Sequence, residues 1–248
     1  MRFALILLAG LAIATVQAEE SDRHTFTGAA DFSLVRADSE LPSWLEGGNG
    51  KLRFDEGHDG LQFSRAFLDY RGRLTNTLNA RVTLNANDDI SNTLDLTEAF
   101  LEWRPVPSSS WRWRSRLGAF YPRLSVENTD AGWSSAYGLS SSVINTWFGE
   151  ELRAIGTDIR LTREFNSAPD HHLSLEGGML YGNDPTGALL AWRGWSAHDR
   201  QTGIWSKLPT PAISAIAPWD PDGEPLPRYD PFTEIDHKPG FYAGVEWQ

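Results

Sequence analysis

The chain has 248 residues, no cysteine, 11 tryptophans and a formal net charge of −11 at pH 7. The lack of cysteine excludes a disulfide scaffold, thiolate metal sites and a cysteine nucleophile. The acidic balance argues against nucleic acid as a partner, because neutralising phosphates requires a basic surface.

The first 18 residues have the features of a secretory signal peptide. A basic start, Met1-Arg2, precedes an almost continuous apolar run from Phe3 to Val16, and Val16-Gln17-Ala18 forms a small-x-small cleavage site. The run is shorter than the roughly 20 residues that a transmembrane helix needs. We therefore expect residues 1–18 to be removed on export and residues 19–248 to form a single domain.

Strand-type alternation dominates the rest of the chain. Between Leu78 and Ala86 every even position is apolar and every odd position is polar, which predicts a strand with one apolar face. Short turn-like stretches between such segments are typical of antiparallel hairpins. The predicted strands cover 24–37, 50–56, 65–74, 78–86, 98–104, 111–120, 149–164, 173–181 and 240–247.

Two long stretches interrupt the hairpins. Residues 123–148 are rich in Ser, Asn and Gly, and residues 183–239 hold nine of the 14 prolines. Long loops are usually functional or disordered, and the tryptophans of the second argue against plain disorder. We expect it to narrow an entrance, with Arg193 and Arg200 nearest the opening. The predicted constriction residues are Trp192, Arg193, Trp195, Arg200, Trp205 and Trp219.

Two architectures fit exported amphipathic strands: a β-sandwich with the apolar faces as its core, or an outer-membrane β-barrel with those faces toward lipid. Strands of about ten residues match the 9 to 11 needed to cross a bilayer, and aromatic residues lie near their ends. If both long loops lie on the extracellular side of a barrel, counting back from residue 247 gives eight strands, the first at 50–56. The predicted strand at 24–37 then has no place in this count.

The polar face of these strands is basic. It carries eight arginines against Asp69, Glu98 and Glu102, a sum of +8 − 3 = +5 in an acidic chain. Arginines that line an aqueous channel attract anions and exclude cations. The predicted pore-lining residues are Arg65, Arg71, Arg73, Arg81, Arg104, Arg112, Arg114 and Arg116.

Several phrases resemble the porin-like outer-membrane proteins of Gram-negative bacteria, whose superfamily includes the phosphate-selective porins. They are Leu117 to Asn128, Gly132-Trp133-Ser-Ser, Ile144 to Trp147, Gly149 to Arg153, and Pro239 to Trp247. The resemblance implies a single-chain transmembrane barrel, often a homotrimer, that admits small hydrophilic solutes. Such porins usually run longer and end on an aromatic residue, so two interpretations stay open: a barrel that closes within 248 residues, or a truncated member of the family.

The sequence contains no G-x-S-x-G, P-loop, G-x-G-x-x-G or H-E-x-x-H motif. The sequence therefore predicts a porin for small, anionic solutes, without enzymatic activity, cofactor or metal. Its expected surroundings are outer-membrane lipid and lipopolysaccharide. The open alternatives are a periplasmic or secreted β-sandwich that binds carbohydrate or another ligand and, third, an outer-membrane enzyme.

Overall fold

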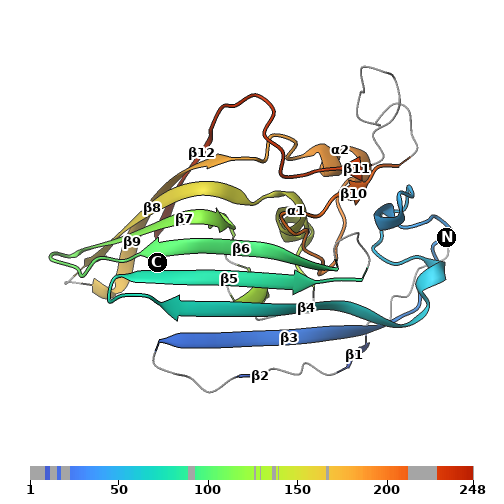
Figure 1. Ribbon diagram of the computed structural model, residues 1–248, viewed down its shortest axis with the longest axis horizontal. Coiled ribbons are helices and arrows are strands. Elements are labelled where there is room, and N and C mark those ends of the chain that lie inside the picture. Colours follow the sequence, from blue (N-terminus) through green and yellow to red (C-terminus); the bar gives the residue numbers. More distant parts are fainter. Residues whose placement is uncertain are drawn as a thin grey trace.

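One antiparallel sheet of ten strands organises the chain (Figure 1). The structure, a computed structural model, describes residues 9–11, 16–17, 23–88, 93–125, 127–128, 130–135, 138, 140–165, 168–211 and 228–247. The strands follow one another in space as β1-β3-β4-β5-β6-β7-β8-β9-β12, and β2 also pairs with β3. Their bounds are β1 Ala9–Leu11, β2 Val16–Gln17, β3 His24–Val35, β4 Gly60–Arg73, β5 Leu78–Ala86, β6 Leu94–Trp103, β7 Trp111–Phe120, β8 Ala154–Phe165, β9 Ala168–Tyr181 and β12 Gly240–Trp247.

The all-β expectation is therefore confirmed, with neighbouring strands joined as antiparallel hairpins. The sheet is open: among the described residues β12 pairs only with β9, and β3 carries β1 and β2 at its far edge. Both short edge strands belong to the segment whose sequence predicts a signal peptide.

The predicted strand at 50–56 is wrong, whereas the leftover stretch at 24–37 contains β3, which pairs with β4 along its whole length. Around 50–56 the chain turns locally into a short helix, η2 Glu56–His58. The Asp55 carboxylate accepts hydrogen bonds from the amides of Gly57 at 2.9 Å and Ser43 at 2.7 Å. Such local bonds compete with strand pairing, as short polar side chains commonly do.

The stretch predicted as a loop at 123–148 contains η3 Ala131–Trp133 and the start of helix α1, Val143–Glu151. The Ser142 side chain caps α1 by accepting a hydrogen bond from the Asn145 amide, so the predicted strand at 149–164 begins only at Ala154. In the part of the chain that is described, no helix has the length and apolar character needed to cross a membrane.

The long connections gather at one end of the strands, where Figure 1 shows α1 beside the later elements α2, β10 and β11. A small hydrophobic core lies here, formed by Trp44, Leu45, Leu189, Leu208 and Tyr229. These core residues come from connections rather than from the sheet. The elements are η1 Trp44–Glu46, α2 Ala188–Arg193, β10 Leu208–Pro209 and β11 Arg228–Tyr229.

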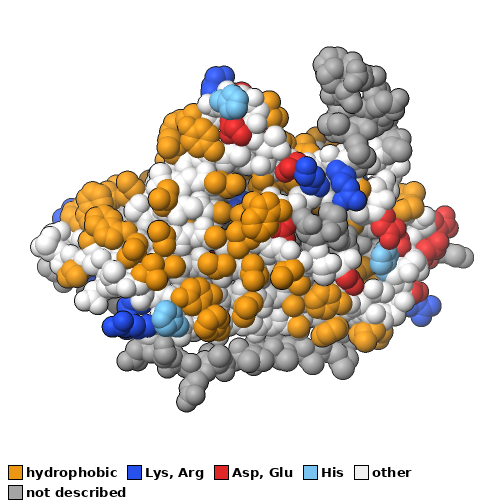
Figure 2. All heavy atoms as spheres, in the orientation of Figure 1, with side chains coloured by type: hydrophobic (Ala, Val, Ile, Leu, Met, Phe, Trp, Pro, Cys, Tyr) orange, Lys and Arg blue, Asp and Glu red, His pale blue; other side chains and the backbone are white. Residues whose placement is uncertain are grey.

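The two faces of the sheet are reversed relative to a water-soluble protein. Apolar side chains on one face are exposed, for example Leu117 at 63% and Ile159 at 47%. Figure 2 shows hydrophobic side chains spread across this face. Several charged side chains on the other face are covered, with Asp69 and Asp158 each 1% exposed and Arg116 5% exposed. The apolar faces of the strands therefore do not form a core.

Candidate functional site

The covered face of the sheet carries a network of ion pairs across neighbouring strands. Asp69 on β4 accepts hydrogen bonds from Arg81 Nε at 2.7 Å, from Thr83 Oγ1 at 2.8 Å and from Arg71 Nε at 2.8 Å. The register places Thr83 directly opposite Asp69, so this carboxylate sits among donors from two strands. Arg81 also lies 3.6 Å from Glu98 on β6.

A second group of pairs spans β7, β8, β9 and β12. Arg116 is registered opposite Asp158 and binds both of its carboxylate oxygens through the guanidinium group. The Tyr242 hydroxyl donates to the same carboxylate at 2.9 Å. Glycine at 178 leaves room for this tyrosine, since an added Cβ would lie 2.4 Å from its ring. Arg160 donates to Glu176 at 3.2 Å.

This network borders a cavity of about 910 Å³. Nine arginines and four carboxylates line it, an excess of five positive charges, 9 − 4 = +5. Strands near both edges of the open sheet contribute, since Thr25 of β3 and Val245 and Glu246 of β12 are among its lining residues. A basic wall in a partly enclosed space concentrates anions and repels cations.

Six of the eight predicted pore-lining arginines border this cavity, and two do not. Arg65 is buried beside Asp31, at 3.2 Å, and Ser134, at 2.7 Å. Arg112 points into solvent and pairs with Glu164 at 2.9 Å. The six that line the cavity are Arg71, Arg73, Arg81, Arg104, Arg114 and Arg116.

Sequence reasoning missed three further arginines of the cavity, Arg23, Arg123 and Arg160. Arg23 precedes β3 and Arg123 follows β7, so neither belongs to an alternating strand pattern. The sequence placed Arg160 among outnumbering acids, including Asp158 and Glu176. Only the register reveals that these two carboxylates pair with arginines of the basic face. These two carboxylates therefore offset part of the positive charge that the sequence predicts for that face.

The connection between β7 and β8 enters the cavity, and the expected constriction loop does not. Tyr121, Leu124, Trp133 and Phe148 all line the space. None of the described residues of 183–239 does so. The prediction chose the longer, tryptophan-rich connection, but its described parts pack on other connections at the end of the sheet.

Two aromatic residues of the entering connection stack on each other. The ring centroids of Tyr121 and Trp133 are 4.4 Å apart with an interplanar angle of 16°. Gly132 and Trp133 both have left-handed backbones, with φ of 64° and 54°. Asn128 Nδ2 donates to the Trp133 carbonyl at 2.9 Å, which helps to hold this strained conformation.

Tyr121 is anchored from both sides. Its amide donates to Glu98 at 3.3 Å, and its hydroxyl accepts a hydrogen bond from the Arg153 guanidinium group, which lies 4.6 Å over the ring. Burial raises the pKa of the Tyr121 phenol to about 12. The phenol is therefore neutral, and these contacts hold Tyr121 at the cavity wall.

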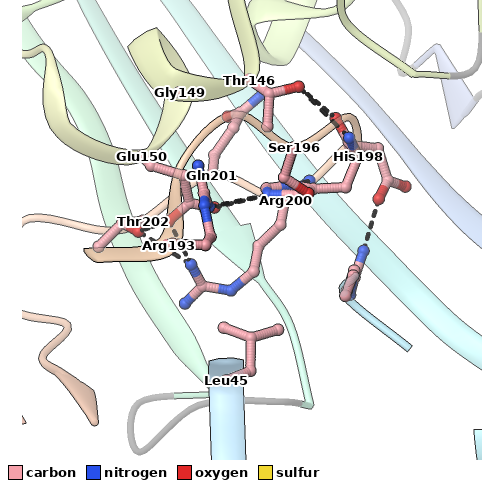
Figure 3. Close-up of polar contacts among 12 residues, drawn as sticks. Leu45, Thr146, Gly149, Glu150, Arg193, Ser196, His198, Arg200, Gln201 and Thr202 are labelled. Atoms are coloured by element: carbon pink, nitrogen blue, oxygen red, sulfur yellow. Dashed lines mark hydrogen bonds and ion pairs between the residues drawn. The ribbon is translucent and has the colours of Figure 1, made fainter. Parts of the chain in front are cut away.

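A second, fully buried charged cluster joins the connections (Figure 3). Arg200 donates to Glu150 at 2.6 Å and to Thr202 Oγ1 at 2.9 Å, and Figure 3 shows the three side chains converging. Arg193 and Arg200 also lie over the Trp44 ring, at 4.5 and 5.5 Å. The expectation that these arginines flank an opening is therefore wrong, because stacking and ion pairing bury them.

His198 lies inside this cluster and is held in a neutral form. Its Nδ1 accepts a hydrogen bond from the Arg200 amide at 3.1 Å, and its Nε2 lies 3.3 Å from Arg193 Nη1 and 3.8 Å from Glu150. Burial and the guanidinium groups of Arg193, Arg53 and Arg200 hold the pKa of His198 well below its ordinary value.

Glu151 ties α1 to the later connections. Its carboxylate accepts hydrogen bonds from the amides of Leu189 at 2.8 Å and Gly187 at 3.0 Å, and from the Tyr229 hydroxyl at 2.5 Å. Burial and this carboxylate raise the pKa of Tyr229. Glu151 therefore holds α1 against the segments that contain α2 and β11.

The predicted tryptophans have different surroundings. Trp192 packs edge-on against Trp44, with centroids 6.4 Å apart. Trp195 and Trp205 are 50% and 64% exposed, and neither lines the cavity. Trp219 lies outside the described residues.

One group of carboxylates within the described ranges could share a cation. Ligand oxygens of Asp184, Glu234 and Asp236 lie within 4.8 Å of one another. Asp184 Oδ2 already accepts hydrogen bonds from the amides of Ile235 and Asp236, at 2.5 and 3.1 Å. Those two bonds explain why the carboxylate sits in this turn without requiring a metal.

Comparison with protein-family models, with curated proteins and with solved structures finds no match for this chain. The geometry of the sheet and its cavity therefore carries the functional argument.

Proposed function

We propose that this chain forms an outer-membrane β-barrel, or part of one, that admits small hydrophilic anions by facilitated diffusion. The observation that carries the proposal is the reversed polarity of the sheet, with exposed apolar side chains outside and ion-paired side chains around a basic cavity. In water the exposed face would be a large apolar patch, whereas a bilayer covers it favourably.

The cavity supports the choice of anions. Its exposed arginines include Arg71 and Arg104, whose side chains are 52% and 58% exposed although each has a carboxylate neighbour. A single carboxylate offsets only one positive charge, and arginines outnumber acids among the residues that line the cavity. The remaining positive field favours anions over cations at the end of the sheet where β4 and β6 finish, near Arg71 and Arg104.

Closure of the barrel is part of the proposal. Export would remove residues 1–18, including β1 and β2, and would free the outer edge of β3. Since β3 and β12 both border the cavity, their free edges are where the sheet would close, with each other or through further strands. Closure is required in lipid because unpaired backbone groups cannot be satisfied there.

The test is detergent dependence combined with conduction. We expect chain 19–248 to be folded and monodisperse only in detergent or lipid, and to give anion-selective channels in a planar bilayer. A protein that stays folded and monodisperse in plain buffer would overturn the proposal and favour the β-sandwich alternative.

A further inference from the structure

We propose that the cavity binds organic anions that combine a carboxylate with a planar apolar body, such as aromatic carboxylates. This inference rests on the proposed function, because it names the class of solute that the pore would select. It comes from the apposition of two surfaces in one cavity: the basic strand wall and an aromatic shelf made of Tyr121, Trp133 and Phe148.

The shelf is built rather than incidental. Gln201 Nε2 donates to the Gly132 carbonyl at 3.0 Å, in addition to the bond that Asn128 makes to Trp133. A Cβ at position 132 would lie 2.4 Å from the Phe67 ring, so this turn needs glycine for space as well as for its backbone angle. Gly149 of α1 likewise leaves room for the Trp133 ring, 3.0 Å from where its Cβ would be.

The basic wall reaches the shelf directly. Arg116 donates from Nη1 to the Tyr121 carbonyl at 3.3 Å, so a strand arginine adjoins the residue that begins the shelf. Arg123 follows two residues later and is exposed to the cavity. Partial desolvation by the surrounding protein lowers the pKa of Arg123, and so do the nearby guanidinium groups of Arg160 and Arg116. An anion placed here would relieve the repulsion among these arginines.

The two surfaces require different parts of one ligand. Guanidinium groups bind carboxylates by paired hydrogen bonds, and aromatic rings favour stacking or edge contacts with another ring. A small inorganic anion would use the arginines alone. An aromatic carboxylate would use both surfaces.

The experiment measures block of chloride current by benzoate and by acetate, which share the carboxylate but differ in the ring. We expect half-block at about tenfold lower benzoate than acetate, since one ring contact of about 1.4 kcal/mol corresponds to tenfold in affinity. Phe148→Ala should abolish most of this difference, and Arg123→Gln should weaken block by both anions. Trp195→Ala, an exposed aromatic residue outside the cavity, is the matched control and should change neither.

A binding titration in detergent separates failure of the inference from failure of the pore. Quenching of tryptophan fluorescence by benzoate, with the same variants, reports occupancy without conduction. Channels that are blocked equally by benzoate and acetate would overturn the inference and leave the porin proposal standing. Benzoate binding that depends on Phe148 without any conduction would support the site and overturn the pore.

Discussion

The strand wall and the assembly of connections both bury charge, but they do so in different ways. On the wall, Arg116 borders a cavity and pairs with Asp158 on the adjacent strand. In the connections, Glu150 and Arg200 have fully buried side chains away from that cavity. Charges of the first kind shape the field that a solute meets, whereas charges of the second kind hold segments in place. Predictions that affect only one region test this division.

The largest effect is expected in the buried cluster. Replacing Glu150 by Leu leaves Arg200 charged and without its carboxylate, which costs about 3 to 5 kcal/mol for a buried pair. Denaturant unfolding in detergent micelles measures this loss. The double variant Glu150→Leu/Arg200→Met should recover much of it, because no uncompensated charge remains. A loss below about 1 kcal/mol in the single variant would show that the cluster does not hold the connections.

The next effect distinguishes lipid from water around the sheet. Ile159 lies near the middle of β8 and is 47% exposed. Ile159→Arg should destabilise the protein by about 2 to 4 kcal/mol if the side chain faces the bilayer interior. On a water-facing surface the same change should cost less than about 0.5 kcal/mol. Unfolding from lipid vesicles measures the difference, and Ile159→Leu is the control that preserves the apolar surface.

A smaller, pH-dependent effect is expected from His198. The unfolded chain should protonate this histidine near its ordinary pKa of 6.5, while the folded protein keeps it neutral. Below pH 6.5 the unfolded chain binds a proton at His198 that the folded protein does not bind. The free energy of unfolding is therefore highest above pH 6.5 and decreases as the pH falls below it. The slope approaches about 1.4 kcal/mol per pH unit for one proton. Unfolding midpoints from pH 8 to 5 measure it, and a His198→Gln variant should lose this part of the slope.

The smallest effect concerns selectivity without stability. The triple variant Arg71→Gln/Arg73→Gln/Arg104→Gln removes three exposed charges from the cavity. We expect the anion-over-cation permeability ratio to fall roughly threefold at low salt and less at high salt, because screening acts over about 8 Å at physiological ionic strength. Reversal potentials in salt gradients measure it. Arg112→Gln is the matched control outside the cavity; equal shifts in both variants would contradict the assignment of the wall.

Much of the sheet could be predicted because strand alternation is a local signal. The segment 78–86 matches β5 residue for residue, since its apolar and polar positions alternate without interruption. The strand predicted at 50–56 failed because Asp55 and Ser43 make local hydrogen bonds that no alternation pattern records. Helix α1 was missed because it begins within a stretch whose serines and asparagines are more typical of loops.

The candidate site was predicted less completely than the sheet. Arg81 and Arg116 were identified because they occupy the polar positions of clear strands, and both line the cavity. None of the described residues of the predicted constriction loop lines the cavity, because loop composition cannot specify which connection folds inward. That outcome depends on packing among distant residues, such as the hydrogen bond from Gln201 to Gly132, 69 positions apart.

The sequence by itself determined most of the strands, their two faces and most of the arginines on the polar face, since a period of two is a property of the local chain. Tertiary structure decided which face is covered, which carboxylates meet the arginines and which connection borders the cavity. Strand register brings Asp158 to Arg116 across 42 positions, and Asp199 meets Arg53 across 146. Interactions between such distant residues depend on how the whole chain packs, and no local pattern in the sequence encodes them.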